Sequence, residues 1–205
     1  MKELWNKRYS INEYIYGKEP NEFLKQELQK ISPGKILFLG EGEGRNAVYA
    51  AKLGWDVDAV DFSDEARKKA LKLADENNVK INYIISDISE FIPDSNHYDA
   101  AGIFYLHLEE NIRKSVHRRI IDALKPSGRL ILEVFEKEQL KYNSGGPKDE
   151  LLLYSLEEIT EDFIELDFEI FAKEKIYLNE GIAHNGEAAV IRFVGTKPLS
   201  PENNL

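Results

Sequence analysis

The sequence predicts an α/β fold in which helices cover a mostly parallel β-sheet, and three observations support it. From residue 36 onward, apolar runs of strand length alternate with longer segments whose apolar residues recur every three or four positions, which is the pattern of repeated βα units. The run at residues 35–40 is apolar on both faces of its pleat, as in a buried central strand. Near the C-terminus, two long β-forming runs predict an antiparallel hairpin.

Composition and charge exclude several classes of protein. The 205 residues include 37 Asp and Glu against 27 Lys and Arg, a formal net charge of −10. Nucleic-acid binding is disfavoured, because it depends on basic side chains that neutralise phosphates. The lack of Cys excludes disulfides, thiolate metal sites and a Cys nucleophile. The sequence has no secretory leader and no run of 18 apolar residues, so we expect a soluble, cytoplasmic protein with no membrane partner.

Capping and breaking residues delimit the expected elements. Gly54 closes the helix before the second strand, Ser63 and Asp64 cap the helix after it, and Pro126 with Gly128 stops the helix after the fourth strand. The expected strands of the parallel part are residues 35–40, 56–63, 81–87, 99–108 and 129–135. The expected helices are residues 21–31, 46–54, 64–76, 109–124 and 156–165.

The last third of the chain has a different texture. A glycine-rich loop with one proline occupies residues 143–149. No positive side chain lies between Lys148 and Lys173, and we interpret this acidic stretch as a solvated helix face. Strands at residues 168–178 and 188–197 form the expected hairpin.

A glycine loop follows the first predicted strand and opens a helix. Such a loop lets a ligand approach bare backbone at the N-terminus of the helix. A dinucleotide-binding fingerprint would need a glycine at position 45, where Arg45 stands. The loop also carries Glu41 and Glu43, which are unfavourable beside a pyrophosphate but compatible with a cationic ligand. The glycines are Gly40, Gly42 and Gly44.

Two acidic residues end the next two strands. Asp61 stands 21 residues after Gly40, where a carboxylate can accept hydrogen bonds from both hydroxyls of a ribose. Asp87, followed by Ile88, ends the third predicted strand and is positioned to accept a hydrogen bond from an adenine amino group. The alternative is ordinary turn chemistry, since Asp and Gly both favour turns.

These motifs together resemble the class I S-adenosylmethionine-dependent methyltransferases. The resemblance covers residues 36–135 and rests on the buried strand, the GxGxG loop, the acidic strand end, Ser-Asp-Ile at the third strand, LKPSG and LILEVF. It implies S-adenosylmethionine as cofactor, S-adenosylhomocysteine as product, and a doubly wound, Rossmann-like sheet of seven strands that ends in an antiparallel hairpin. Ser127 departs from the family, which commonly has glycine there.

The flanks resemble a narrower bacterial group, the tellurite-resistance and thiopurine type methyltransferases. This similarity rests on WNKRY (5–9), YIYGKEPNEFL (14–24), SGGPKDELLLYSLEEI (144–159) and EGIAHNG (180–186). It implies an N-terminal lid over the cofactor, although the aromatic residues there can equally serve to pack the following helix onto the sheet.

We therefore expect one methyltransferase domain at residues 1–198. Its parts are an N-terminal lid and helix (1–34), a cofactor-binding core (35–135), and a C-terminal helix and hairpin (136–198), followed by a disordered tail (199–205). The expected cofactor-binding residues are Tyr16, Gly40, Glu41, Gly42, Gly44, Asp61, Phe62, Asp87 and Ile88.

Methyl transfer from a sulfonium mainly needs the reactants aligned in a dry pocket, and a general base is optional. His107 and His184 are the candidate catalytic residues, each of which can alternatively have a local structural role. We expect His97 and His117 to be ordinary exposed residues, and no metal site. Glu133 is either functional or at the wet end of its strand. The candidate substrate-binding residues are Trp5, Arg8, Tyr9 and Tyr105.

The sequence thus predicts a methyltransferase that acts on a small molecule, with a thiol or a chalcogen oxyanion as the acceptor. A noncatalytic module that binds S-adenosylmethionine or S-adenosylhomocysteine is the alternative. A nicotinamide-dependent oxidoreductase comes third, because the glycine spacing fits it poorly. The oligomeric state is not indicated.

Overall fold

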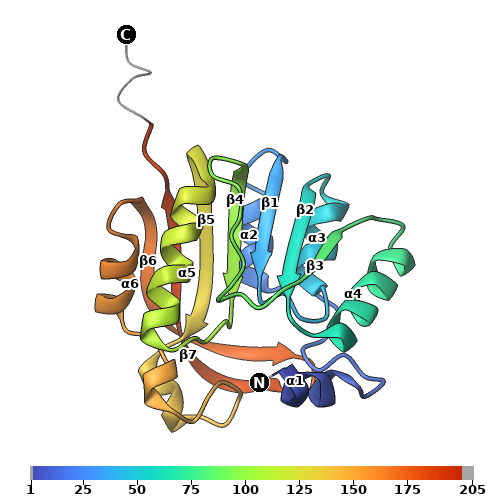
Figure 1. Ribbon diagram of the computed structural model, residues 1–205. Helices are drawn as coiled ribbons and strands as arrows, with labels where there is room; N and C mark the ends of the chain where they lie inside the picture. Colours follow the sequence, from blue (N-terminus) through green and yellow to red (C-terminus); the bar gives the residue numbers. More distant parts are fainter. Residues whose placement is uncertain (1, 200–205) are drawn as a thin grey trace.

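A seven-stranded sheet organises the structure, a computed structural model that describes residues 2–199 (Figure 1). The strand order is β3-β2-β1-β4-β5-β7-β6. Strands β1 to β5 pair in parallel, and β7 is antiparallel to both of its neighbours. The predicted Rossmann-like fold with a C-terminal antiparallel hairpin is therefore confirmed. The strands are β1 (Lys35–Leu39), β2 (Asp56–Asp61), β3 (Asn82–Ile85), β4 (Tyr98–Phe104), β5 (Leu124–Phe135), β6 (Asp167–Glu180) and β7 (His184–Thr196).

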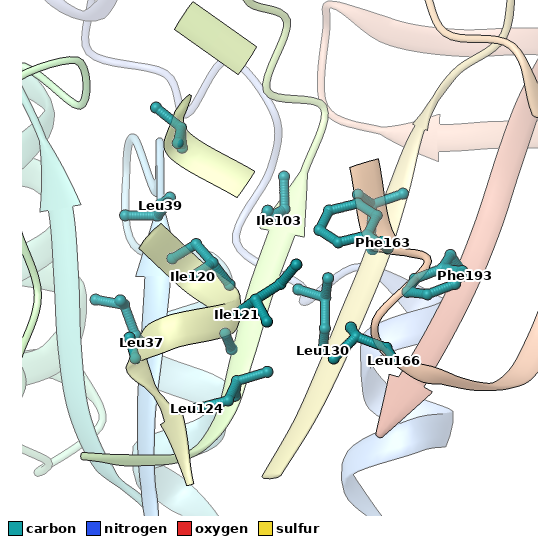
Figure 2. Packing of buried hydrophobic residues seen from close by; sticks show 14 of the residues in the cluster. Leu37, Leu39, Ile103, Ile120, Ile121, Leu124, Leu130, Phe163, Leu166 and Phe193 are labelled. Atoms are coloured by element: carbon teal, nitrogen blue, oxygen red, sulfur yellow. The ribbon is translucent and has the colours of Figure 1, made fainter. Parts of the chain in front are cut away.

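Helices cover both faces of the sheet. On one face α5 and α6 pack on the sheet through residues such as Ile120 and Phe163 (Figure 2). On the other face α2 and α3 enclose Ile36, Phe38 and Trp55. Residues 200–205 of the expected tail lie outside the described residues. The helices are α1 (Lys2–Tyr9), α2 (Glu22–Leu28), α3 (Arg45–Lys52), α4 (Asp64–Glu76), α5 (Glu110–Ala123) and α6 (Leu156–Phe163), with two 3₁₀ turns that were not predicted, η1 (Lys137–Lys141) and η2 (Glu150–Leu152).

The histidine of α5 that we expected to be exposed is buried. His117 is 0% exposed, and its Nδ1 lies 2.8 Å from Oδ2 of Asp162 on α6. Arg113 Nε donates to the same oxygen at 2.9 Å. The interpretation of the acidic stretch as a solvated face was therefore wrong at Asp162, because this carboxylate joins α5 to α6 through two basic partners. Within residues 2–199, no helix is long and apolar enough to cross a membrane.

Strand β5 begins five residues earlier than predicted. It includes the turn that precedes the predicted strand, where Ser127 N donates to Lys197 O at 2.8 Å and Lys197 N donates to Gly128 O at 2.9 Å. Ser127 is exposed and has φ +65°, in the left-handed region that favours glycine. Ser127, which replaces the family's common glycine, therefore has a strained backbone.

Ser127→Gly is expected to raise the free energy of unfolding by about 0.5–1 kcal/mol, because relief of the positive φ outweighs the added flexibility of the unfolded chain. Urea denaturation of the two proteins measures this difference. A lower midpoint for the glycine variant would contradict the strain.

Candidate active site

The glycine loop joins β1 to α3 at the carboxyl edge of the sheet. Gly40, Gly42 and Gly44 have φ of +65°, +61° and +88°. A Cβ on Gly44 would lie 2.6 Å from the Cβ of Ala70, so only glycine lets α3 start this close to α4. The loop therefore exposes main chain, free of side chains, where the helix begins.

Asp61 ends β2 and faces this loop, as predicted. Its Oδ2 accepts a hydrogen bond from Gly42 N at 3.0 Å, and its Oδ1 accepts one from Ser63 N at 2.9 Å. The residue is 4% exposed, and burial raises its pKa. Each carboxylate oxygen can accept a second hydrogen bond, so Asp61 retains the capacity to bind the two hydroxyls of a ribose. Phe62, the next residue, is half-buried.

Asp87 and Ile88 lie just past the end of β3. Asp87 Oδ1 accepts hydrogen bonds from the backbone N and the Oγ of Ser89 at 2.9 and 2.7 Å, which lowers the pKa of Asp87. The carboxylate is exposed. Ile88 is buried, and its Cδ1 would lie 3.6 Å from a Cβ on Gly40. The structure thus brings Gly40 and Ile88 together at the same edge.

The two carboxylates of the loop have structural partners. Glu41 Oε1 accepts a hydrogen bond from Ala47 N at 2.7 Å, at the start of α3. Glu43 Oε2 accepts one from Ile15 N at 2.7 Å, and its Oε1 pairs with Lys69 Nζ at 2.7 Å. From the sequence, both carboxylates are compatible with a cationic ligand. The structure instead uses Glu43 to fasten the N-terminal segment to the loop, because its two oxygens are engaged and the residue is buried.

Glu41 gives the folded protein a defined pH dependence. Burial raises its pKa to about 8, so the folded state keeps a proton that the unfolded chain releases near pH 4.5. Unfolding releases this proton, and stability from this group falls as pH rises from about 4.5 to 8. Glu41→Gln keeps the shape without the titration. Between pH 5 and pH 8, we expect the free energy of unfolding of the variant to rise by at least about 1 kcal/mol relative to that of the wild type. Urea denaturation at both pH values measures this change. The same difference between the two proteins at both pH values would contradict a buried, protonated Glu41.

The N-terminal segment crosses the glycine loop and meets the tip of the β6–β7 hairpin. Figure 1 shows α1 and the far ends of β6 and β7 together below the sheet. Ile15 O accepts hydrogen bonds from Ile182 N and Ala183 N at 2.9 and 3.1 Å. Tyr16 O accepts one from Arg45 Nη1 at 3.0 Å. The N-terminal segment therefore lies against the glycine loop and the hairpin tip, and its role as a lid stays a prediction.

Aromatic residues of α1 lie over the loop, and this arrangement places three of the four candidate acceptor contacts. The hydroxyl of Tyr9 would lie 2.8 Å from a Cβ on Gly42. Trp5 stacks on Tyr9 with 5.4 Å between ring centroids, and the Arg8 guanidinium lies 4.8 Å from the Trp5 ring. Trp5 and Arg8 are thus held as one stack above the glycine loop, while Arg8 also donates to Tyr16 Oη at 3.2 Å.

His184 lies among three aromatic rings from different parts of the chain. The ring centroids of Tyr16, Tyr105 and Phe135 lie 4.5, 4.5 and 5.3 Å from that of His184. Tyr105 follows β4, which ends four residues earlier than predicted, and has φ +52°. Strained non-glycine residues of this kind cluster at functional sites. We call these four residues the aromatic chamber.

His107 borders the aromatic chamber. Its ring stacks on Phe135 at 5.6 Å, and its Nδ1 lies 2.7 Å from Leu152 O. Because a carbonyl only accepts, Nδ1 carries the proton and Nε2 holds a lone pair; this Nε2 is buried and has no partner among the described residues. Burial lowers the pKa of His107 to about 4, so the ring is neutral at physiological pH.

A buried network of charged groups supports the chamber. Glu133 is 1% exposed and accepts hydrogen bonds from Asn21 Nδ2, Tyr105 Oη and Arg192 Nε, each at 2.6 Å. The sequence suggested either a functional role or a wet strand end for Glu133. The wet end is excluded, because burial and three donors enclose the carboxylate.

A second carboxylate at the hairpin tip was missed from the sequence. Glu180 Oε2 pairs with Arg45 Nη2 at 2.9 Å and lies 3.1 Å from Nδ1 of His184. The signal was available, because Glu180 stands four residues before His184. The two side chains meet only because the turn between β6 and β7 is tight and spans residues 181–183. The sequence predicts a nine-residue connection there, which would separate them.

Comparisons with known proteins find similarity to methyltransferases. Residues 36–128 match a family model described as a methyltransferase domain. A curated relative from Rickettsia bellii (strain OSU 85-389), named ubiquinone biosynthesis O-methyltransferase, is 28% identical over 142 residues, which cover 69% of this chain and 59% of the relative. A relative of the same name from Rickettsia akari (strain Hartford) is 28% identical over 151 residues, 74% of this chain and 58% of the relative. The chain thus spans about three fifths of these relatives' length.

Solved structures share the fold. TehB from Haemophilus influenzae matches with a TM-score of 0.70 and 16% identity, over 96% of this chain and 66% of that one. A protein described under the conversion of a disulfide bond into a thioacetal group during echinomycin biosynthesis matches with a TM-score of 0.80 and 14% identity, over 100% and 95% of the two chains. At these identities the likeness concerns the fold.

Residues 36–128 thus match a methyltransferase domain, the class of enzyme that the sequence predicts, and this class uses S-adenosylmethionine as its cofactor. The narrower resemblance to the tellurite-resistance and thiopurine types stays a prediction.

Proposed function

We propose that this protein transfers the methyl group of S-adenosylmethionine to a small-molecule acceptor. One observation carries the proposal: the glycine loop, Asp61 and the Asp87–Ile88 pair lie at one edge of the sheet, under a segment fastened to the loop through Glu43. This set of residues suits a ribose with free hydroxyls and an uncharged adenine. The basic side chains beside the loop, Arg45 and Lys69, already pair with Glu180 and Glu43 rather than standing free for a pyrophosphate.

The residues of this edge divide among the parts of the cofactor. When bound, the cofactor supplies an electrophilic methyl group on a sulfonium, beside which aromatic faces such as that of Tyr16 are favourable. Asp61 binds the ribose, Asp87 and Ile88 hold the adenine, and Phe62 lies next to them. The methionine end lies along Gly40, Glu41, Gly42 and Gly44.

The acceptor end is the aromatic chamber with His107 beside it. The sequence favours a thiol or a chalcogen oxyanion, and the relatives' names point to an oxygen acceptor. We expect a compact acceptor, because the rings of Tyr105 and His184 already lie 4.5 Å apart and the N-terminal segment binds the hairpin tip beside them.

The experiment is an assay of S-adenosylhomocysteine release with a panel of small acceptors: thiols, phenols, selenite and tellurite. We expect release with at least one of them, above the rate without acceptor. Binding of both cofactor forms with no turnover on any member of the panel would favour the noncatalytic module. Absence of cofactor binding would contradict both.

A further inference from the structure

The hairpin tip places a carboxylate directly against the imidazole of the aromatic chamber. Glu180 ends β6, and His184 begins β7 after a turn of three residues. The Nδ1 of His184 lies 3.1 Å from Oε2 of Glu180. Arg45 donates to the same oxygen at 2.9 Å, and Asn21 Nδ2 lies 3.4 Å from the other oxygen. Glu180 is therefore held in place by Arg45, the first residue of α3, and by Asn21, the N-cap of α2.

This contact fixes which nitrogen of His184 carries the proton. A carboxylate only accepts hydrogen bonds, so Nδ1 is the protonated nitrogen and Nε2 holds the lone pair. In this orientation, Nε2 can accept a proton from an acceptor molecule, and Glu180 holds the ring in place from the other side. Burial lowers the pKa of His184, which favours the neutral ring, and Glu180 opposes the shift.

The free edge of His184 faces the glycine-rich loop at residues 143–149. A Cβ on Gly145 would lie 3.1 Å from Nε2 and 2.6 Å from Cδ2 of His184. Because position 145 is glycine, the loop covers this edge without a side chain. Among residues 2–199, Nε2 has no hydrogen-bond partner, so its lone pair is not used by the fold.

The charges around the chamber disfavour an anionic acceptor. Two carboxylates, Glu133 and Glu180, border it, and the two guanidinium groups beside them already pair with carboxylates: Arg45 with Glu180, and Arg192 with Glu133. An oxyanion would therefore find both buried guanidinium groups already paired, and Arg8, which donates to Tyr16 Oη at 3.2 Å, is exposed to solvent. The titratable groups that face His184 and its neighbours are Arg8, Tyr16, Glu43, Arg45, Tyr105, His107, Glu133, Glu180 and Arg192.

We infer that Glu180 is a positioning residue that holds His184 as the general base for an acceptor that binds neutral, as a hydroxyl or thiol compound. This inference rests on the proposed methyl transfer and narrows its acceptor to molecules that arrive with a proton. His184 Nε2 takes that proton while the acceptor atom bonds to the methyl carbon. The bond between this carbon and the sulfonium sulfur breaks, and its electron pair stays on sulfur.

The test compares Glu180→Gln with the wild type in two independent measurements. The first needs no cofactor: nitrogen NMR of labelled protein reports which ring nitrogen of His184 is protonated. We expect Nδ1–H in the wild type and a mixture of tautomers in the variant, because an amide both donates and accepts. The second is kcat against pH with phenol and thiophenol as acceptors. We expect kcat to fall about 10–100-fold in the variant, with KM for S-adenosylmethionine unchanged and the pH profile altered.

Controls separate this inference from simpler failures. Glu187→Gln changes an exposed carboxylate on the same hairpin, three residues beyond His184, and should match the wild type. Glu180→Asp should recover part of the lost rate. A wild type protonated on Nε2, an unchanged kcat in Glu180→Gln, or faster turnover of selenite than of thiols and phenols would overturn the inference. Failure of S-adenosylhomocysteine to bind the wild type would instead overturn the proposed function.

Discussion

Replacing Asp61 with alanine is expected to weaken binding of S-adenosylhomocysteine by about 1–3 kcal/mol, a rise in Kd of roughly 5- to 150-fold. The carboxylate lies against Gly42 and keeps acceptor capacity for a ribose. Its removal takes away both the ligand's partner and the group that holds the backbone of the loop. Calorimetric titration of the purified variant measures the change.

The matched control for Asp61 lies on the same strand. Asp58 is also buried, but it pairs with Lys35, Tyr98 and Asn82 toward the opposite end of the sheet. Asp58→Asn should leave the Kd for S-adenosylhomocysteine within twofold of the wild-type value. It also shows whether loss of any buried carboxylate from β2 weakens binding. If Asp61→Ala and Asp58→Asn bind the product equally well, the assignment of Asp61 to the ribose is wrong.

Glu133→Ala should have the largest effect on stability, a loss of about 3–5 kcal/mol. The carboxylate is 1% exposed and accepts from three donors, so its removal leaves Asn21, Tyr105 and Arg192 with unmet hydrogen bonds inside the protein. Urea denaturation at pH 7 measures the free energy of unfolding. Because Tyr105 is part of the aromatic chamber, the surviving folded protein should also lose activity.

The other carboxylate on Arg192 supplies the control. Glu174 accepts from Arg192 Nη1 at 2.8 Å, but its side chain is 40% exposed. Glu174→Ala should therefore cost less than about 1 kcal/mol. Equal losses in the two variants would show that burial does not govern this network.

The fold was predictable because its signals are local. The alternation of apolar runs with helical periodicity, the capping Ser63 and the closing Gly54 each specify one element, and α4 begins with Ser63 accepting from Ala66 N as expected. The errors fall where one segment continues through a turn. Strand β5 runs through Pro126 because its partner β7 supplies hydrogen bonds at Ser127 and Gly128 that no local pattern announces.

The candidate site was predictable in part. Residues that follow strand ends, such as Asp61 and Asp87, could be placed because parallel strands end at one edge. Contacts across distant segments could not. Glu180 with Arg45, and Asn21 with Glu133, join residues 135 and 112 positions apart. His117 was misplaced for the same reason, because the partner that buries it is Asp162 on another helix.

Calorimetric titration of the wild type with S-adenosylmethionine and S-adenosylhomocysteine, beside a nicotinamide dinucleotide, tests the central claim most directly. The glycine loop, Asp61 and Asp87 predict micromolar binding of both methionine-derived ligands and no binding of the dinucleotide, since Arg45 and Lys69 beside the loop already pair with Glu180 and Glu43. Binding of the dinucleotide alone would contradict the account and identify the site as one for redox chemistry.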